Sequence, residues 1–169
     1  MNAIKRITQS LLKLIKSVPQ IAGHAGAAKS ARSERLTRRV ALALALTSRG
    51  AVWNDVLAID RLAVVLRVEW FARAVHPWDH DLPERRRREL FAQQCLEDVD
   101  AAIPRLFEQL PEIDTLEIRV LERASKTQII TGVVHRSDLA LQVGSSLGMR
   151  LKTIGINYQC PNLVLEPIA

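Results

Sequence analysis

Residues 115–135 read TLEIRVLERASKTQIITGVVH, and this stretch carries the clearest fold signal in the chain. Its first six residues alternate between polar and apolar side chains, which is typical of a β-strand with one buried face. The polar segment 123–126 then supplies a turn, and the residues after it are apolar at odd and even positions alike. A strand that is apolar on both faces is usually buried inside a sheet. We therefore expect a strand at 115–122, a turn, and a second strand at 127–135.

The segments on either side supply the other expected elements. A run rich in β-branched residues at 62–70 predicts a strand. A helical pattern runs from Pro83 to Pro111, and Pro104 inside it predicts either a kink or two abutting helices. The remaining expected elements are a helix from Ser137 or Asp138 to Gly148, a strand at 151–158 and a short strand at 163–165.

Residues 62–158 thus give the order strand, helix, strand, strand, helix, strand. This order matches the split βαβ arrangement called ferredoxin-like, so the predicted fold class is α+β with a ferredoxin-like βαββαβ core. The first and third strands of such a sheet are central, and these two are apolar on both faces. The second strand would lie at an edge, and it alone alternates regularly between apolar and charged residues.

Two helices are expected before this core. Segment 33–48 alternates Leu with Ala before Gly50, which favours a helix although the alternation also permits a strand. A short helix should follow, with Asn54 or Asp55 near its start. Because the central strands are apolar on both faces, we expect these N-terminal helices to cover the second face of the sheet. The domain prediction is an arm at 1–29 and a single α+β domain at 30–169.

The net charge of the chain is concentrated at its N-terminus. The first 33 residues hold six basic residues and no acidic residue, and the net charge of the whole chain is also +6. The rest of the chain is therefore balanced, with 18 basic and 18 acidic residues. This distribution indicates a cationic arm joined to a neutral body, rather than a basic domain.

Residues 2–18 of the arm place apolar side chains at helical spacing beside lysines, which predicts an amphipathic helix. Pro19 and the small residues 22–28 predict a flexible connection after it. The helix is expected to dock on this domain, on a second copy or on another protein, and an anionic membrane surface is the next alternative. Nucleic acid is less favoured, because the arm has no aromatic side chain on which a base could stack. The predicted partner-binding or surface-binding residues are Ile4, Lys5, Ile7, Leu11, Lys13, Leu14, Ile15, Lys16 and Val18.

The composition argues against several classes of protein. Cys95 and Cys160 are too few for a disulfide framework and favour a reducing compartment, so a cytoplasmic location is expected. The longest apolar run has seven residues, whereas a membrane-spanning helix takes about 20. Lysines interrupt the candidate signal peptide, and an organellar transit peptide is a minor alternative. No cofactor is expected, and Cys95 is expected in the core because it lies on the apolar side of the long helix.

Arg85, Arg86, Arg87 and Arg88 begin this long helix. Successive helical residues point in different directions, and Glu84 can pair with Arg88, so a solvated charged surface is the first interpretation. Positive charge at a helix N-terminus nevertheless conflicts with the helix dipole. A phosphate held by Arg85, Arg86 and the free amides would relieve this conflict, so these two arginines are the predicted anion-binding residues.

Residues 76–81 read HPWDHD and gather two imidazoles with two carboxylates. His76, Asp79, His80 and Asp81 are therefore candidate metal ligands or an acid–base group, with His135 expected nearby. The alternative is a tight turn in which Asp79 or Asp81 caps the following helix and Trp78 packs inward.

Glu117-Ile118-Arg119, with Asp114 upstream, resembles the acid-x-base triplet of restriction-endonuclease-like enzymes. The chain departs from that pattern, since Arg stands where those enzymes usually have Lys and Asp114 is not on a preceding strand of its own. Neither a zinc-protease motif nor a Walker A motif occurs in the sequence, and the small-residue run Gly144-Ser145-Ser146-Leu147-Gly148 lies at the end of a predicted helix, not at the start of a helix that follows a strand.

These observations favour a non-enzymatic interaction or assembly module whose arm helix docks on a protein partner or an anionic surface, with self-association as a homodimer included. The alternative is a small enzyme or anion-binding protein that uses the 76–81 loop with Arg85, Arg86 and His135. An enzyme is the less favoured of the two, because function has to be argued from a site and no catalytic motif stands in the structural context that it requires.

Overall fold

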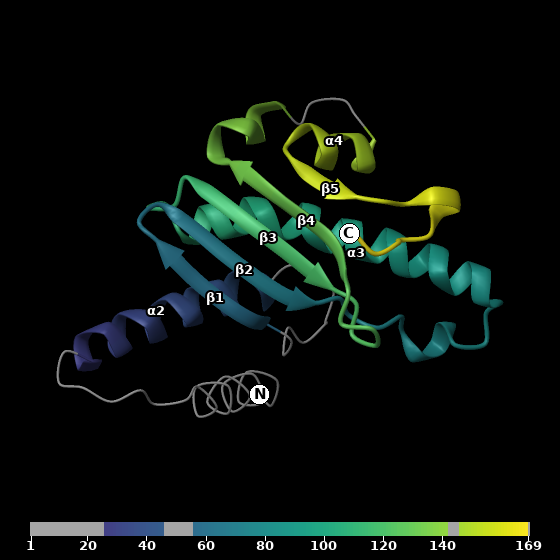
Figure 1. Ribbon diagram of the computed structural model, residues 1–169, viewed down its shortest axis with the longest axis horizontal. Coiled ribbons are helices and arrows are strands. Elements are labelled where there is room, and N and C mark those ends of the chain that lie inside the picture. Colours follow the sequence, from purple (N-terminus) through teal and green to yellow (C-terminus); the bar gives the residue numbers. More distant parts are fainter. Residues whose placement is uncertain (1–25, 46–55, 142–145, 169) are drawn as a thin grey trace, which may run out of the picture.

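The computed structural model describes residues 26–45, 56–141 and 146–168 (Figure 1). The described helices are α2 (Gly26–Ala45), α3 (Glu84–Gln109) and α4 (Leu147–Thr153), with 3-10 turns at Pro77–Asp79, Arg136–Leu141 and Pro161–Leu163. The strands are β1 (Val56–Leu62), β2 (Val65–Phe71), β3 (Thr115–Leu121), β4 (Gln128–His135) and β5 (Ile156–Tyr158). The α+β class is thus confirmed. The predicted arm helix at 2–18 lies outside the described residues and stays a prediction.

The five strands form one mixed sheet in the order β1-β2-β3-β4-β5. β2 and β3 are parallel neighbours, and the other neighbouring strands are antiparallel. α3 connects the two parallel strands and covers one face of the sheet, as the crossover helix of a βαβ unit does (Figure 1). α2 packs against α3, and α4 packs against α3 and β5. None of the described helices combines the length and apolar composition that crossing a bilayer requires.

The ferredoxin-like prediction is wrong in its strand order. A split βαβ unit places a third strand between the two parallel strands, whereas β2 and β3 pair directly along their whole length. β3 therefore lies in the middle of the sheet instead of at its edge. The cause of the error is physical, because apolar residues show which faces of a strand are buried but do not show which strand is its neighbour.

The short helix expected near Asn54 is also wrong, because strand β1 begins at Val56. Val56 and Ile59 have helical spacing, but β1 forms a hairpin with β2 through Ala63 and Val64. Ala63 has a positive φ of 54°, which is the backbone conformation that tight hairpin turns use. The remaining N-terminal helix, α2, begins at Gly26, seven residues earlier than predicted. It packs against α3 and so does not cover the second face of the sheet.

The C-terminal elements are shifted along the chain relative to the prediction. Residues 136–141 form a 3-10 turn, α4 spans 147–153, and β5 is only three residues long. The sequence predicts that Gly148 ends a helix, but it lies inside α4, where a Cβ atom would stand 2.5 Å from the Tyr158 hydroxyl. This glycine thus permits close packing rather than a left-handed helix end. In place of the strand predicted at 163–165 there is a 3-10 turn followed by an isolated bridge between Gln159 and Glu166.

The core lies between the sheet and α3. Alternate residues of the strands, such as Leu66, Trp70 and Ile118, are at most 1% exposed and belong to one cluster with Ile103 and Leu106 of α3. Each such side chain contributes about 1.5–3 kcal/mol through burial. β4 is apolar at both parities because a register shift opposite Val120 and Leu121 leaves Ile129 and Ile130 both buried.

Two arginines bind the carbonyl groups at the end of α3, which continues unbroken through Pro104. The last carbonyls of a helix have no partner within it and attract cations. Arg39 of α2 donates to Gln109 O and pairs with Glu112 at 2.6 Å. Arg136 donates to the carbonyls of Phe107, Leu110 and Ile113, with its guanidinium 4.7 Å from the centre of the Phe107 ring. These contacts attach α2 and the end of β4 to α3.

Candidate functional site

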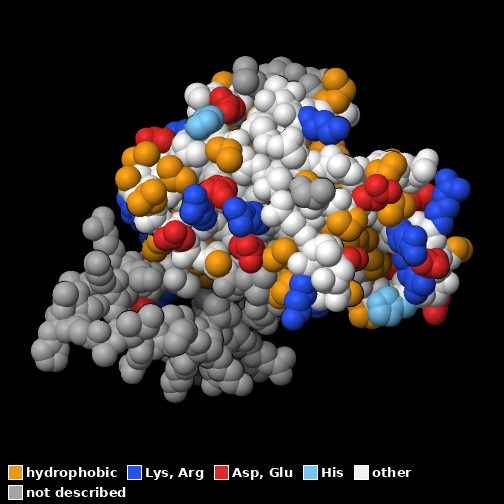
Figure 2. Space-filling model, in the orientation of Figure 1, with side chains coloured by type: hydrophobic (Ala, Val, Ile, Leu, Met, Phe, Trp, Pro, Cys, Tyr) orange, Lys and Arg blue, Asp and Glu red, His pale blue; other side chains and the backbone are white. Residues whose placement is uncertain are grey.

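The side of the sheet opposite α3 carries a set of polar and apolar side chains that we call the open face. Its residues alternate along each strand with those that face the core. Figure 2 views this side and shows cationic and anionic side chains intermixed over the strands, beside an apolar group. By strand register, the open face consists of Ala58, Asp60, Leu62, Val65, Arg67, Glu69, Thr115, Glu117, Arg119, Thr131, Val133, His135 and Asn157.

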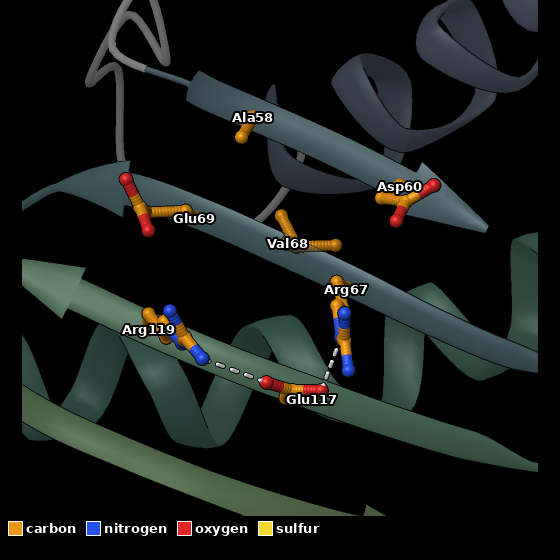
Figure 3. Close-up of a pocket in the computed structure, with 7 residues that line it drawn as sticks. All are labelled: Ala58, Asp60, Arg67, Val68, Glu69, Glu117 and Arg119. Carbon is orange, nitrogen blue, oxygen red and sulfur yellow. Dashed lines mark hydrogen bonds and ion pairs between the residues drawn. The ribbon is translucent and has the colours of Figure 1, made fainter. Parts of the chain in front are cut away.

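Glu117 lies at the centre of the charged part of the open face. Its carboxylate accepts hydrogen bonds from Arg67 of β2 and, at 3.1 Å, from Arg119 of its own strand (Figure 3). The side chain of Glu117 is only 18% exposed, whereas Arg67 is 59% exposed and Arg119 51%. Its hydrogen bond with Arg67 lowers the pKa of Glu117 and raises the pKa of Arg67. Glu117 is therefore held ionised.

A depression in the open face surrounds this group. Its lining residues come from three neighbouring strands and are Ala58, Asp60, Arg67, Val68, Glu69, Glu117 and Arg119 (Figure 3). Asp60 and Glu69 form no ion pair with any other residue that the structure describes. The depression thus holds one carboxylate bound by two guanidinium groups and two further carboxylates at its sides.

The parallel register explains why these charges meet. β2 contains Arg67-Val68-Glu69 and β3 contains Glu117-Ile118-Arg119, which is the same spacing with the charges reversed. Parallel pairing places Arg67 beside Glu117 and Glu69 beside Arg119. Opposite charges on neighbouring strands stabilise a sheet by roughly 0.2–1 kcal/mol per pair. The sequence prediction missed this group because it treated the two strands separately, although the reversed charge order is a signal for their pairing.

In the acid-x-base triplet, the acid and the base are in contact with each other. Arg119 binds Glu117 of the same triplet, so its guanidinium is engaged within the protein. Asp114, the acid upstream of the triplet, has its Oδ1 atom 4.0 Å from Nε of Arg136. Among the residues that the structure describes, no three His, Cys, Asp or Glu side chains are arranged to hold a metal ion.

The 76–81 loop is a tight turn, as the second interpretation of its sequence predicts, but the predicted aspartate cap and the predicted packing of Trp78 are wrong. Backbone hydrogen bonds join Asp79 N to His76 O and His80 N to Pro77 O, and the Trp78 amide donates to His76 Nδ1. Pro83 begins the following helix without a side-chain cap, so neither Asp79 nor Asp81 caps it. Trp78 is 88% exposed and does not pack inward. Within the described residues, the four predicted metal ligands of this loop are not brought together as a metal group.

His135 is far from this loop. It lies in the row of Val65 and Thr115 and contacts Thr115 Oγ1 at 3.1 Å, whereas the loop follows the other end of β2. Six residues of strand separate the two ends, a distance of roughly 20 Å. The alternative site that combined His135 with the 76–81 loop is therefore wrong.

The predicted anion-binding arginines have partners on their own helix. Arg85 and Arg86 both bind Glu89, at 3.2 and 3.0 Å, and Arg88 pairs with Glu84. The hydrogen bond from Arg86 is the main reason that the pKa of Glu89 is lowered. These pairs support the solvated charged surface, and the proposal of a bound phosphate at Arg85 and Arg86 stays untested.

Two ionisable groups are buried beneath the helix layer. Cys95 is in the core, as expected, and burial raises the pKa of its thiol well above the usual range. Asp98 binds Arg73 at 2.7 Å, and burial raises its pKa despite this partner. Arg73 follows β2, so this pair attaches the start of the 76–81 loop to α3.

Comparison with family models, with curated proteins and with solved structures found no match for this chain.

Proposed function

We propose that this chain is a non-enzymatic interaction module that binds a protein partner through its open face. The observation that carries the proposal is the difference between the two sides of the sheet. One side is covered by α3, and the other presents apolar side chains next to an ordered group of charges. Leu62 is 73% exposed and Val133 47% exposed, on opposite sides of the Arg67–Glu117 pair.

The charges of the open face favour protein over nucleic acid as the partner. Asp60, Glu69 and Glu117 outnumber Arg67 and Arg119, so the charged part of this face has a net negative charge. Phosphate groups are bound by surfaces with an excess of cations. Protein interfaces, in contrast, combine apolar contacts with polar groups whose hydrogen bonds are satisfied. Arg67 and Arg119 both donate to the Glu117 carboxylate. This arrangement suits contact with a protein partner better than proton transfer, because a general base needs an accessible lone pair.

The cationic arm is proposed as the second contact of the module. Its partner is a protein or a second copy of this chain, with an anionic membrane surface as the next choice and nucleic acid less favoured. A homodimer and a cytoplasmic location belong to the same proposal. A small enzyme or an anion-binding protein that uses Arg85 and Arg86 stays the alternative, without His135, because His135 and the 76–81 loop are at opposite ends of the sheet.

Affinity capture with matched variants tests the open face. The tagged full chain is incubated with an extract of its source cells, and captured proteins are quantified by mass spectrometry. The test variant is Leu62→Asp with Val133→Asp, which places two charges on exposed positions. Because such surface changes usually alter stability by less than about 0.5 kcal/mol, circular dichroism should show an unchanged fold.

The control variant is Trp78→Ala, which removes another highly exposed apolar side chain from a different surface. The proposal predicts that one protein, captured at near-equal molar amounts by the wild type and by the control, is lost with the test variant. Sedimentation equilibrium of the same proteins shows whether that partner is a second copy. If the Trp78→Ala variant loses this captured protein while the Leu62→Asp, Val133→Asp variant retains it, the open face is rejected as the binding surface.

A further inference from the structure

We propose that residues 2–18 of the same chain dock on the open face as an amphipathic helix. This inference deepens the proposed function, because it names an internal ligand for the surface that a partner would bind. A partner would then have to displace the arm, so the arm sets the affinity of the module.

The charges of the two surfaces are complementary. Asp60 and Glu69 form no ion pair among the described residues, although both line the depression in the open face. The arm carries Lys5, Arg6, Lys13 and Lys16, and no acidic residue precedes Glu34. Each of these carboxylates lies beside an arginine in the strand register but is not within ion-pair distance of it, so lysines at the rim of the arm helix can reach both. Ion pairs of this kind direct orientation more than they add affinity.

The apolar residues of the two surfaces are complementary as well. The predicted arm helix has a continuous stripe that includes Ile7, Leu11 and Leu14. The open face offers Leu62 and Val133, both exposed, on opposite sides of the charged group. An amphipathic helix of this length is only marginally stable in water unless its apolar side is covered. Docking would cover the stripe and the exposed valine and leucine together.

The dimensions of the arm and of the sheet agree. A helix of residues 2–18 would be about 25 Å long at 1.5 Å per residue. β2 and β3 are each seven residues long, which corresponds to about 23 Å at 3.3 Å per residue. One helix laid along these strands would therefore extend over the open face from end to end.

The connection between the arm and α2 is long enough for docking on the same chain. α2 begins at Gly26, packs against α3, and lies along the β1 side of the sheet (Figure 1). A helix on the open face would be two layers away, or about 20 Å at 10 Å per layer. Residues 19–25 can extend to about 24 Å. Because a tethered ligand has an effective concentration in the millimolar range, the arm of the same chain outcompetes that of a second copy.

Thiol labelling of the full chain tests the docking. Val133→Cys is introduced with Cys160→Ser, while Cys95 is kept because it is buried and its pKa is raised. The rate of reaction with a maleimide is compared between this protein and one that also carries Leu11→Asp and Leu14→Asp. If the arm covers the open face for more than 90% of the time, its disruption should raise the labelling rate by at least about tenfold. A matched protein with Trp78→Cys in place of Val133→Cys should react at the same rate with either arm.

The concentration dependence of labelling identifies the source of the arm. Docking on the same chain predicts equal protection of the thiol introduced at position 133 at low and high micromolar concentrations of protein. Protection that increases with concentration would mean that a second copy supplies the arm, and would overturn the proposal. Equal labelling with intact and disrupted arms would overturn docking altogether. That result would leave the proposed function standing if the Leu62→Asp, Val133→Asp variant still loses its captured partner.

Discussion

Replacing Arg136 with methionine should destabilise the protein strongly, because this side chain holds the end of α3. The guanidinium group donates to the carbonyl oxygens of Phe107, Leu110 and Ile113 at 3.2, 3.0 and 2.6 Å. All three residues are at most 1% exposed. Methionine keeps much of the aliphatic stem but supplies no donor, so these oxygens lose a partner that water replaces only in part.

The expected loss is about 3 kcal/mol. Hydrogen bonds from a charged donor contribute about 1.5–3 kcal/mol each, and the contact with the Phe107 ring contributes roughly 0.5–1 kcal/mol. The simple sum is too large, because Arg136 is 36% exposed and solvent screens part of its interaction. For a chain of this size, a loss of 3 kcal/mol lowers Tm by roughly 10 °C.

Urea unfolding followed by circular dichroism measures this loss. Arg136→Lys keeps the charge but not the forked geometry, and should fall between the wild type and Arg136→Met. Arg85→Met is the control, since Arg85 is 83% exposed and pairs only within its own helix, and it should cost under about 0.5 kcal/mol. A loss below about 1 kcal/mol for Arg136→Met would refute the role of Arg136 as a helix cap.

Three further predictions concern other parts of the molecule. Gly132→Ala should destabilise the sheet by at least about 2 kcal/mol in urea unfolding, because its Cβ would stand 2.6 Å from Gly155 O; unchanged stability would contradict this packing. The hydrogen bond from Arg39 lowers the pKa of Glu112, so the wild type should be more stable than Glu112→Gln at neutral pH. This difference in stability should disappear as the pH falls below about 4, where Glu112 becomes protonated. A difference in stability that does not depend on pH would count against the ion pair. Of the two thiols, Cys160 should react with Ellman's reagent in the folded protein and Cys95 only after unfolding; the reverse order in peptide mapping would contradict the burial of Cys95.

The sequence predicts the elements whose pattern reports burial directly. β3, β4 and α3 are found where the alternation and the helical spacing place them, because the packing that the pattern reflects is the packing that forms. β1 is missed because an edge strand with few buried residues has no strong alternation, and the spacing of Val56 and Ile59 also fits a helix. The end of a helix is wrongly predicted at Gly148, because the sequence does not distinguish a glycine needed for close contact with Tyr158 from a glycine that ends a helix.

The candidate site is harder to predict because it depends on strand order. The reversed charges of Arg67-Val68-Glu69 and Glu117-Ile118-Arg119 become a group only when β2 and β3 are parallel neighbours. The pattern of one strand taken alone contains no information about this pairing, which shows only when the charge orders of the two strands are compared. Trp78 shows the opposite case, since its large apolar surface predicts burial, but the 3-10 turn at Pro77–Asp79 leaves it exposed.

Photo-cross-linking from the open face tests the account most directly. A photoreactive amino acid is placed at Val133 of the full chain, or at Trp78 as the comparison, and the protein is irradiated in an extract of its source cells. We predict that position 133 becomes joined to a partner protein or to residues 2–18, and that position 78 does not. Cross-links from position 78 alone would contradict the assignment of the open face as the binding surface.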